Sequence, residues 1–169
     1  KIVAELSNKY LAERFVFIST DKAVDPVGIM GSTKSLSEKL VLSMPYNQFS
    51  LFTSVRFGNV LNSRGSVVPL FLKQIDQGGP ITVTDREMTR FMMGISEAVS
   101  LIIQAATLTS GADVFMLNMG PALNISDLAR KLIRLRGLRV GEDISINYTG
   151  VRAGEKLVES LVAKDEETT

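Results

Sequence analysis

The segment VFISTDKAVDPVGIMGSTKS, residues 16–35, contains the pattern that decides the fold. It opens with a short apolar run, which is typical of a strand buried on both faces of a parallel sheet. Three polar residues follow directly: Thr20, Asp21 and Lys22. Because open α/β sheets bind ligands at the carboxyl ends of their strands, these three side chains are candidates for a functional site.

Apolar patterning along the rest of the chain predicts further strands and helices in alternation. Besides the strand 14–19, we expect strands at 50–60, 81–85, 113–120 and 144–150. We expect helices at 1–13, 31–44, 66–77, 97–108 (capped by Ser96), 127–137 (capped by Ser126 and closed by Gly137) and 154–162. This order predicts an α/β fold with a parallel sheet, followed by shorter, mixed elements from about Ser66 onward.

Composition narrows the chemistry that the chain can perform. Its 169 residues suffice for a real core, and 19 Lys and Arg against 18 Asp and Glu give no field that would attract nucleic acid. It contains no Cys and no His, so acid–base work falls to Lys, Asp, Glu or Tyr, and no metal site is expected. No apolar run reaches the 18 or so residues that a membrane span needs, which predicts a soluble piece.

Met30 stands four residues before Lys34, where the two side chains share one helical face. Short-chain dehydrogenases place a catalytic Tyr at that spacing, and a Met can neither donate nor accept a proton. Taken alone, Met30 is most simply interpreted as core packing.

Four ordered motifs resemble the nucleotide-sugar 4,6-dehydratases of polysaccharide biosynthesis, which are extended short-chain dehydrogenases acting on UDP-N-acetylglucosamine. They are STDKAVDPVGIMGSTK (19–34), VRFGNVLNSRGSVVPLF (55–71), ITVTDREMTRFMM (81–93) and GVRAGEKLVESL (150–161). The resemblance covers the whole chain as the C-terminal part of the catalytic domain. It implies the second half of an NAD(P)-binding Rossmann-like sheet in 1–65 and a small mixed α/β substrate-binding lobe mainly in 66–169.

In this family the large, membrane-anchored branch carries Met where smaller relatives carry Tyr, so Met30 resembles a marker of that branch. One departure is Gly28, where the family usually has Asn. A Gly could adopt a positive φ there at little steric cost, so the departure does not predict inactivity.

The resemblance implies an internal redox cycle on NAD or NADP that yields a UDP-4-keto-6-deoxy sugar. Asp21 would protonate the leaving C6 hydroxyl, Lys22 would remove the C5 proton, and Thr20 would bind near the C4 hydroxyl. The remaining implied roles are cofactor binding by Ser19, Met30, Lys34 and Phe57, and substrate binding by Asn59, Arg90, Arg152 and Glu155. The arginines would meet the diphosphate or uridine, and Glu155 would bind a ribose hydroxyl or orient Arg152.

Alternatives remain open at this point. A UDP-sugar epimerase or a C5-inverting dehydratase of the same superfamily would use the same loop. A fragment without catalysis is a third hypothesis, because the chain has no glycine-rich turn that would hold a pyrophosphate at a helix N-terminus. We expect a homo-oligomer in the cytoplasm, with a membrane anchor upstream of Lys1 at the inner face of the membrane as an open alternative.

Overall fold

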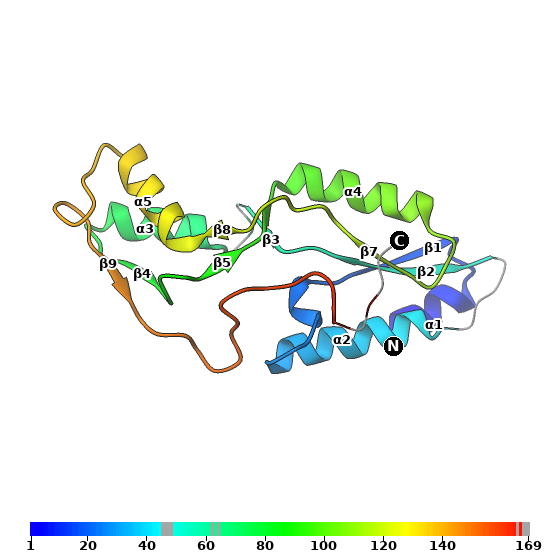
Figure 1. Cartoon of the computed structure of the whole chain (residues 1–169). Coiled ribbons are helices and arrows are strands. Elements are labelled where there is room, and N and C mark those ends of the chain that lie inside the picture. Colours follow the sequence, from blue (N-terminus) through cyan, green and yellow to red (C-terminus); the bar gives the residue numbers. More distant parts are fainter. Residues whose placement is uncertain (45–48, 62, 64, 165, 167–169) are drawn as a thin grey trace. The chain divides into compact units, whose positions relative to one another are not determined.

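The computed structural model describes residues 1–44, 49–61, 63, 65–164 and 166, and the chain divides into two compact units (Figure 1). The first unit contains Lys1–Gly58, Ser96–Asn118 and Ser160–Thr169. The second contains Asn59–Ile95 and Met119–Glu159. The polypeptide chain therefore passes from the first unit to the second and back again two times.

The first unit is built on a three-stranded parallel sheet of order β1-β2-β7. Its strands are β1 (Arg14–Ile18), β2 (Leu51–Arg56) and β7 (Asp113–Met116), and its helices are α1 (Ile2–Lys9), α2 (Ile29–Leu42) and α4 (Ile95–Leu108). Figure 1 shows α1 and α2 on one face of the sheet and α4 on the other. The parallel α/β arrangement predicted from the sequence is confirmed.

Strand β2 is buried along almost its whole length because helices cover both faces of the sheet. Phe52 packs with Ala4 of α1 and Val41 of α2, and its ring centroid lies 5.2 Å from that of Phe15. The buried Thr53 meets its hydrogen-bonding needs by donating from Oγ1 to the carbonyl of Asp113 at 2.8 Å. The polar residues in this strand therefore cost little free energy, since they keep partners.

Arg56, the last residue of β2, belongs to a buried ionic cluster. Its Nη2 lies 2.7 Å from Glu38 Oε2 and its Nε 2.9 Å from Glu38 Oε1, while its Nη1 lies 2.6 Å from Glu166 Oε2. Burial alone would lower the pKa of Arg56, but its hydrogen bonds to Glu38 and Glu166 raise that pKa above its ordinary value. The hydrogen bond from Arg56 also lowers the pKa of Glu166. The cluster fastens α2 and the C-terminal segment to the sheet.

The second unit is a mixed α/β body with its own core. Its elements are β3 (Asn59–Val60), α3 (Val67–Asp76), β4 (Ile81–Val83), β5 (Thr89–Arg90), β6 (Met92–Met93), β8 (Leu123–Asn124), α5 (Ile125–Leu135) and β9 (Ile146–Tyr148). Strands β3–β6 and β4–β9 pair in parallel, and β5–β8 pair antiparallel. The core joins Phe71 of α3, Ile81 of β4 and Ile133 of α5, all almost fully buried.

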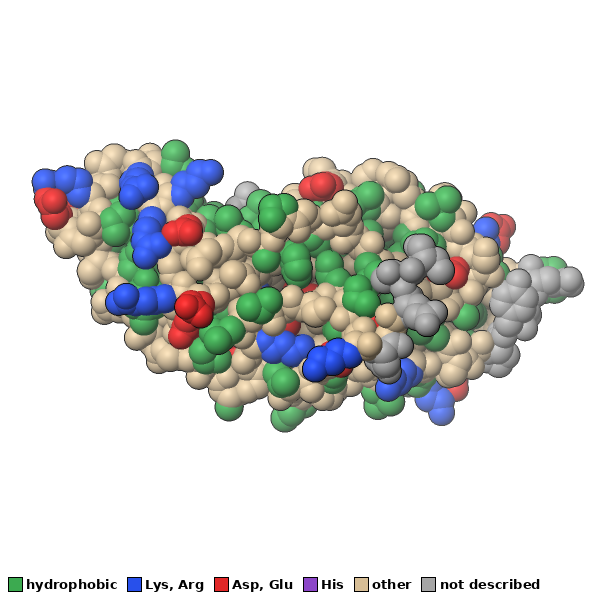
Figure 2. All heavy atoms as spheres, in the orientation of Figure 1, with side chains coloured by type: hydrophobic (Ala, Val, Ile, Leu, Met, Phe, Trp, Pro, Cys, Tyr) green, Lys and Arg blue, Asp and Glu red, His purple; other side chains and the backbone are tan. Residues whose placement is uncertain are grey.

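Charged side chains of the second unit are largely paired at its surface. Figure 2 shows Lys and Arg standing beside Asp and Glu over the part that carries α5. The ion pairs there include Arg130–Asp127, Arg136–Asp76, Arg139–Glu142 and Arg139–Asp143. No helix in the described part of the chain combines the length and the apolar character that crossing a membrane requires.

Three local predictions were wrong. Helix α4 begins at Ile95, so Ser96 lies in its first turn. Helix α5 is capped by Asn124, whose side chain accepts from the backbone N of Asp127, while the buried Ser126 instead donates to the carbonyl of Arg86. The segment 154–162 forms no helix but turns and bends. Gly154 has φ +81, outside the helical region, and contacts with β5 determine the path of this segment.

Candidate functional site

The predicted Thr20, Asp21 and Lys22 form a tight turn at the carboxyl end of β1. A short 3₁₀ helix, η1 (Asp21–Ala23), begins there, and Thr20 caps it by accepting from the backbone N of Lys22 at 3.4 Å. Hydrogen bonding to the neighbouring strand continues past the end of β1, because Asp21 N donates to the carbonyl of Phe57 at 3.2 Å. The turn is therefore held by the sheet, and the predicted residue Phe57 lies directly beside it.

Asp21 is completely buried and uses its two carboxylate oxygens differently. Oδ1 accepts from Thr20 Oγ1 at 2.9 Å and pairs with Lys22 Nζ at 2.8 Å. Oδ2 is buried and has no hydrogen-bond partner among the described residues, and the same holds for the hydroxyl of the adjacent Ser19. Buried polar atoms without partners cost free energy, and a polar ligand that formed hydrogen bonds with these two atoms would remove that cost.

Helix α2 approaches this turn through Gly31. A Cβ at position 31 would lie 2.2 Å from the carbonyl oxygen of Lys22, so no residue other than Gly fits without displacement. Gly28, the N-cap of α2, has φ −124, so the positive φ considered for it is not adopted, and any residue could take this extended backbone. Asp25 carries the positive φ of the loop instead, at +39.

Lys34 and Met30 differ in their surroundings. Lys34 Nζ donates to the carbonyl of Ile18 at 2.8 Å and lies 4.8 Å from the ring centroid of Phe17, at the carboxyl end of β1. Met30 is 53% exposed, so the interpretation of it as core packing was wrong. Lys34 is thus bonded to the same strand end as Asp21, while the Met30 side chain is exposed.

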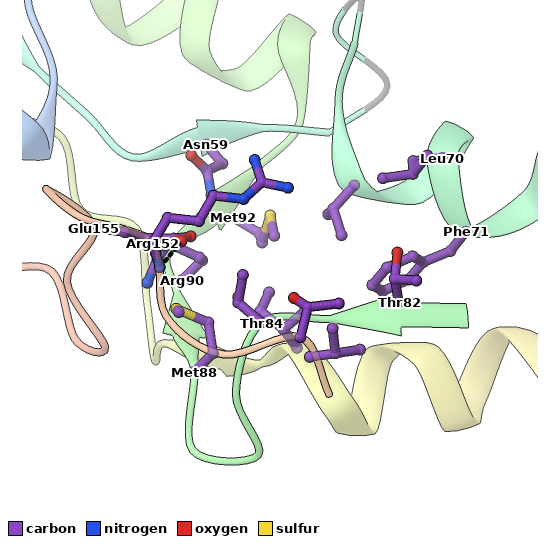
Figure 3. A pocket seen from close by; sticks show the side chains of 14 residues that line it. Asn59, Leu70, Phe71, Thr82, Thr84, Met88, Arg90, Met92, Arg152 and Glu155 are labelled. Atoms are coloured by element: carbon purple, nitrogen blue, oxygen red, sulfur yellow. Dashed lines mark hydrogen bonds and ion pairs between the residues drawn. The ribbon is translucent and has the colours of Figure 1, made fainter. Parts of the chain in front are cut away.

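The second unit contains a pocket of about 490 Å³ (Figure 3). Four predicted residues line it: Asn59, Arg90, Arg152 and Glu155. Its walls combine apolar side chains with threonine hydroxyls, among them Leu70, Phe71, Met88, Met92, Thr84 and Thr149. This mixture suits a ligand that has both a flat apolar part and an anionic part.

Charged groups gather at one end of this pocket, where Figure 3 shows Arg90, Arg152 and Glu155 together. Arg90 is buried, and its Nη2 lies 3.2 Å from Glu155 Oε1. Glu155 Oε2 is 3.5 Å from the backbone N of Arg152, and the Arg152 residue itself is exposed. Glu155 therefore contacts the backbone of Arg152 and the guanidinium of Arg90.

Sequence reasoning missed several residues that lie beside the predicted site residues. Gly31 was overlooked, although a Gly inside a helical pattern signals close packing. Thr84 and Thr149 were missed because isolated threonines in short strands carry no signal. Asn62 and Arg64 of the second motif lie outside the described residues.

Curated proteins with similar sequences act in polysaccharide and nucleotide-sugar metabolism. The capsular polysaccharide biosynthesis protein CapD of Staphylococcus aureus is 52% identical over 167 residues, which are 98% of this chain and 28% of CapD. A UDP-glucose 4-epimerase of Rickettsia canadensis is 39% identical over 166 residues, which are 96% of this chain and 47% of that protein. The chain thus spans less than half the length of these relatives.

Solved structures share the fold. Pen from Bacillus thuringiensis superposes with a TM-score of 0.84 at 37% identity, over 94% of this chain and 50% of Pen. The dTDP-glucose 4,6-dehydratase DesIV of Streptomyces venezuelae, solved with NAD and DAU bound, gives a TM-score of 0.80 at 16% identity, over 95% of this chain and 54% of DesIV. The predicted Rossmann-like fold is confirmed. A family model described as polysaccharide biosynthesis protein matches residues 1–169, and this chain belongs to that family.

Proposed function

We propose that this chain is part of an NAD(P)-dependent enzyme that dehydrates a UDP-N-acetyl-hexosamine to its 4-keto-6-deoxy derivative for surface polysaccharide biosynthesis. The observation that carries the proposal is the buried Asp21, which is hydrogen-bonded to Lys22 at a strand end and whose Oδ2 has no partner within the part of the chain that the structure describes. A 4,6-dehydration needs one acid and one base close together. The chain contains no His and no Cys, and this turn supplies both functions.

The strand end fits the cofactor that the proposal requires. The unpartnered Ser19 hydroxyl and the Lys34 ammonium lie at the carboxyl end of β1, where ribose hydroxyls and a carboxamide would find polar partners. When bound, NAD(P) would accept a hydride from C4 of the sugar and return it to C6. The presence of NAD in the DesIV structure, which shares this fold, supports the assignment.

Asp21 and Lys22 would divide the proton transfers between them. As the hydride leaves C4, the proton of the C4 hydroxyl would leave through Thr20, Asp21 or water. Once C4 is a ketone, the C5 proton is acidic, and Lys22 would take it and return a proton to C5 when C6 receives the hydride. Asp21 would give a proton to the C6 hydroxyl, which leaves as water while the C5–C6 double bond forms. Oδ1 already accepts two hydrogen bonds, so Oδ2 is the oxygen that would carry the transferred proton. Met30 takes no part in these transfers, and Thr20 would hold the C4 oxygen.

The pocket of the second unit would bind the nucleotide. Arg152 is exposed and lines this pocket, and a guanidinium suits the bidentate recognition of phosphate oxygens. Leu70 and Met92 offer apolar surface to the uracil ring, and Thr84 and Thr149 offer hydroxyls to its polar edge. Asn59 at the pocket wall would contact the sugar.

Product mass tests the proposal directly. Incubated with UDP-N-acetylglucosamine, the full-length protein should yield a product lighter by one water. Lys22→Met and Asp21→Asn should each lower kcat by about 10²–10⁴-fold, the usual contribution of a positioned acid or base. Ser37→Ala, at a half-buried position of α2 where the hydroxyl donates to the carbonyl of Thr33 in the same helix, is the matched control and should keep full activity. Wild-type rates in Lys22→Met would refute the assigned roles.

A UDP-sugar epimerase is the second candidate, favoured by the 39% identity to the Rickettsia canadensis enzyme. Epimerisation at C4 requires no proton transfer at C5 and no loss of water. A single base for the proton of the C4 hydroxyl would then suffice, whereas Asp21 and Lys22 together offer an acid and a base, which is why dehydration is preferred. A product of unchanged mass with inverted C4 would establish the epimerase instead.

A further inference from the structure

Helix α2 buries few side chains against the sheet of the first unit. Its buried residues are Gly31, Glu38 and Val41, and Val41 is the large apolar one among them. Val41 packs with Phe52 of β2, toward the C-terminal end of the helix. Apolar contacts are not directional, so they press a helix onto a sheet without determining by themselves where along the sheet it lies. The position of α2 therefore depends on its directional contacts.

Glu38 makes such a directional contact through both of its carboxylate oxygens. It is 2% exposed, and Oε1 accepts from Arg56 Nε at 2.9 Å while Oε2 accepts from Arg56 Nη2 at 2.7 Å. The hydroxyl of Ser54 donates to Oε1 at 3.4 Å. A shift of α2 along the sheet would lengthen or bend at least one of the two bonds to the guanidinium. A buried ion pair adds little net stability compared with apolar side chains of the same volume, so its geometry is its main contribution.

Arg56 lies between the two residues of β2 that hold the turn containing Asp21. Ser19 N donates to the carbonyl of Val55 at 2.8 Å, and Asp21 N donates to the carbonyl of Phe57 at 3.2 Å. The side chain that fixes α2 is thus flanked in its own strand by the two carbonyls that fix the turn. The helix and the turn are therefore positioned from the same point of the sheet.

Lys34 lies one helical turn before Glu38, so the two side chains share a face of α2. Lys34 Nζ donates to the carbonyl of Ile18 at 2.8 Å, at the carboxyl end of β1. Gly31 lies a further turn earlier, where a Cβ would be 2.2 Å from the carbonyl oxygen of Lys22. A displacement of α2 would therefore move the Lys34 ammonium and the contact between the helix and the turn together.

We infer that Glu38 and Arg56 are positioning residues: their buried ion pair fixes α2 along the sheet and so brings the Lys34 ammonium to the end of β1, beside Asp21. Both act through Lys34 and through the turn, and we assign neither a contact with a ligand. Glu166, the other carboxylate partner of Arg56, belongs to the C-terminal segment and not to α2. The ligand that Lys34 meets rests on the proposed function, whereas the position of α2 does not.

Acetylation of lysine amines, followed by mass spectrometry on the full-length protein, reports the position of Lys34 without any ligand. Lys39, exposed on the same helix, is the internal reference. A Gln side chain has one acceptor oxygen, so Glu38→Gln loses the two-pronged pair. We expect the ratio of Lys34 to Lys39 acetylation rates to rise by about 10-fold, the worth of one hydrogen bond to a charged group.

Glu166→Gln is the matched control, because it makes the same change in the other partner of the same guanidinium. Its acetylation ratio should stay within about 2-fold of wild type, since α2 keeps its own bonds to Arg56. An unchanged ratio in Glu38→Gln would overturn the inference. Equal rises in Glu38→Gln and Glu166→Gln would also overturn it, because they would show that the charge around Arg56 matters and not the position of α2.

Calorimetry with NAD⁺ on the full-length protein tests the consequence for binding. Glu38→Gln should raise Kd by about 10-fold, and Glu166→Gln by less than about 2-fold. In a Lys34→Met background, Glu38→Gln should change Kd by less than about 2-fold, because no ammonium is left to position. A further 10-fold loss in that background would overturn the inference. Wild-type protein that binds no NAD⁺ would refute the cofactor of the proposed function, while the acetylation ratio would still decide the position of α2.

Glu38→Asp is the second variant, for use if Glu38→Gln fails to fold. It keeps a negative charge beside the buried Arg56, but its side chain is shorter by one methylene, so both bonds can form only if α2 shifts. We expect the acetylation ratio of Lys34 to Lys39 to rise here too. A ratio equal to wild type would show that charge alone suffices and would contradict the inference.

Discussion

Substituting Gly31 by Ala tests whether the fit between α2 and the Asp21 turn sets the catalytic geometry. The new Cβ would lie 2.2 Å from the carbonyl oxygen of Lys22 and 3.2 Å from the Cβ of Pro26. Real Cβ atoms essentially never approach other atoms within 3.0 Å. The helix and the turn must therefore separate by the difference between 3.0 and 2.2 Å, about 0.8 Å.

Two effects on stability oppose each other in Gly31→Ala. Ala is favoured over Gly inside a helix by about 1 kcal/mol, whereas overpacking typically costs about 1–3 kcal/mol. The net loss of unfolding free energy should therefore stay within roughly 2 kcal/mol, and the protein should fold. Activity is more sensitive, because misplacing a reacting group by about 1 Å can cost around 100-fold in rate. We expect kcat to fall by about 10–100-fold.

Steady-state kinetics on the full-length protein, with urea denaturation alongside, measures both effects. Ser32→Ala, at the next position of the same helix and exposed, is the matched control and should leave kcat within about 2-fold of wild type. Full activity in Gly31→Ala would refute the reasoning, because it would mean that the turn tolerates the displacement or takes no part in catalysis.

Further predictions concern stability. Glu38→Gln leaves the buried Arg56 with Glu166 as its remaining carboxylate partner among the described residues and should lower the unfolding free energy by about 3 kcal/mol in urea titrations; a loss below about 1 kcal/mol would contradict this. Glu166→Gln should cost about 0.5–1 kcal/mol at about pH 7, because the carboxylate is partly exposed. Because pairing lowers the pKa of Glu166 in the folded protein, Glu166 contributes its full stabilisation above the pKa of the unfolded chain, about 4.3. This stabilisation disappears as the pH falls through the lower pKa of the folded protein. A difference in unfolding free energy between Glu166→Gln and wild type that persisted in acid would contradict the pairing. Asn124→Ala removes the cap of α5 and should cost about 1 kcal/mol in thermal unfolding, whereas an unchanged Tm would argue against the cap.

The sequence predicted the parallel sheet and the turn because their signals are local. The apolar run 14–18 and the polar residues after it are contiguous, and α2 follows with a regular apolar period. Residues that directly follow a parallel strand lie at the carboxyl edge of the sheet, so the location of the turn could be inferred from the sequence without knowledge of its packing.

Features that depend on tertiary contacts could not be predicted. The segment 154–162 has a helical pattern, yet Gly154 breaks it and β5 takes the carbonyl of Leu157. Asn124 and Ser126 are both suitable caps and both donate to the carbonyl of Arg86, and the position at which the helical backbone begins decides that Asn124 caps α5. The return of Ser96–Asn118 to the first unit depends on β7 pairing with β2, which no local pattern reveals.

Solvent deuterium at C5 tests most directly the claim that the Asp21 turn performs a dehydration. The full-length protein would be incubated with UDP-N-acetylglucosamine in D₂O and the product examined by NMR. The account predicts a 4-keto-6-deoxy sugar with deuterium at C5, formed by wild type and by Ser37→Ala but not by Lys22→Met. A product that keeps its C6 hydroxyl and its C5 proton would contradict it.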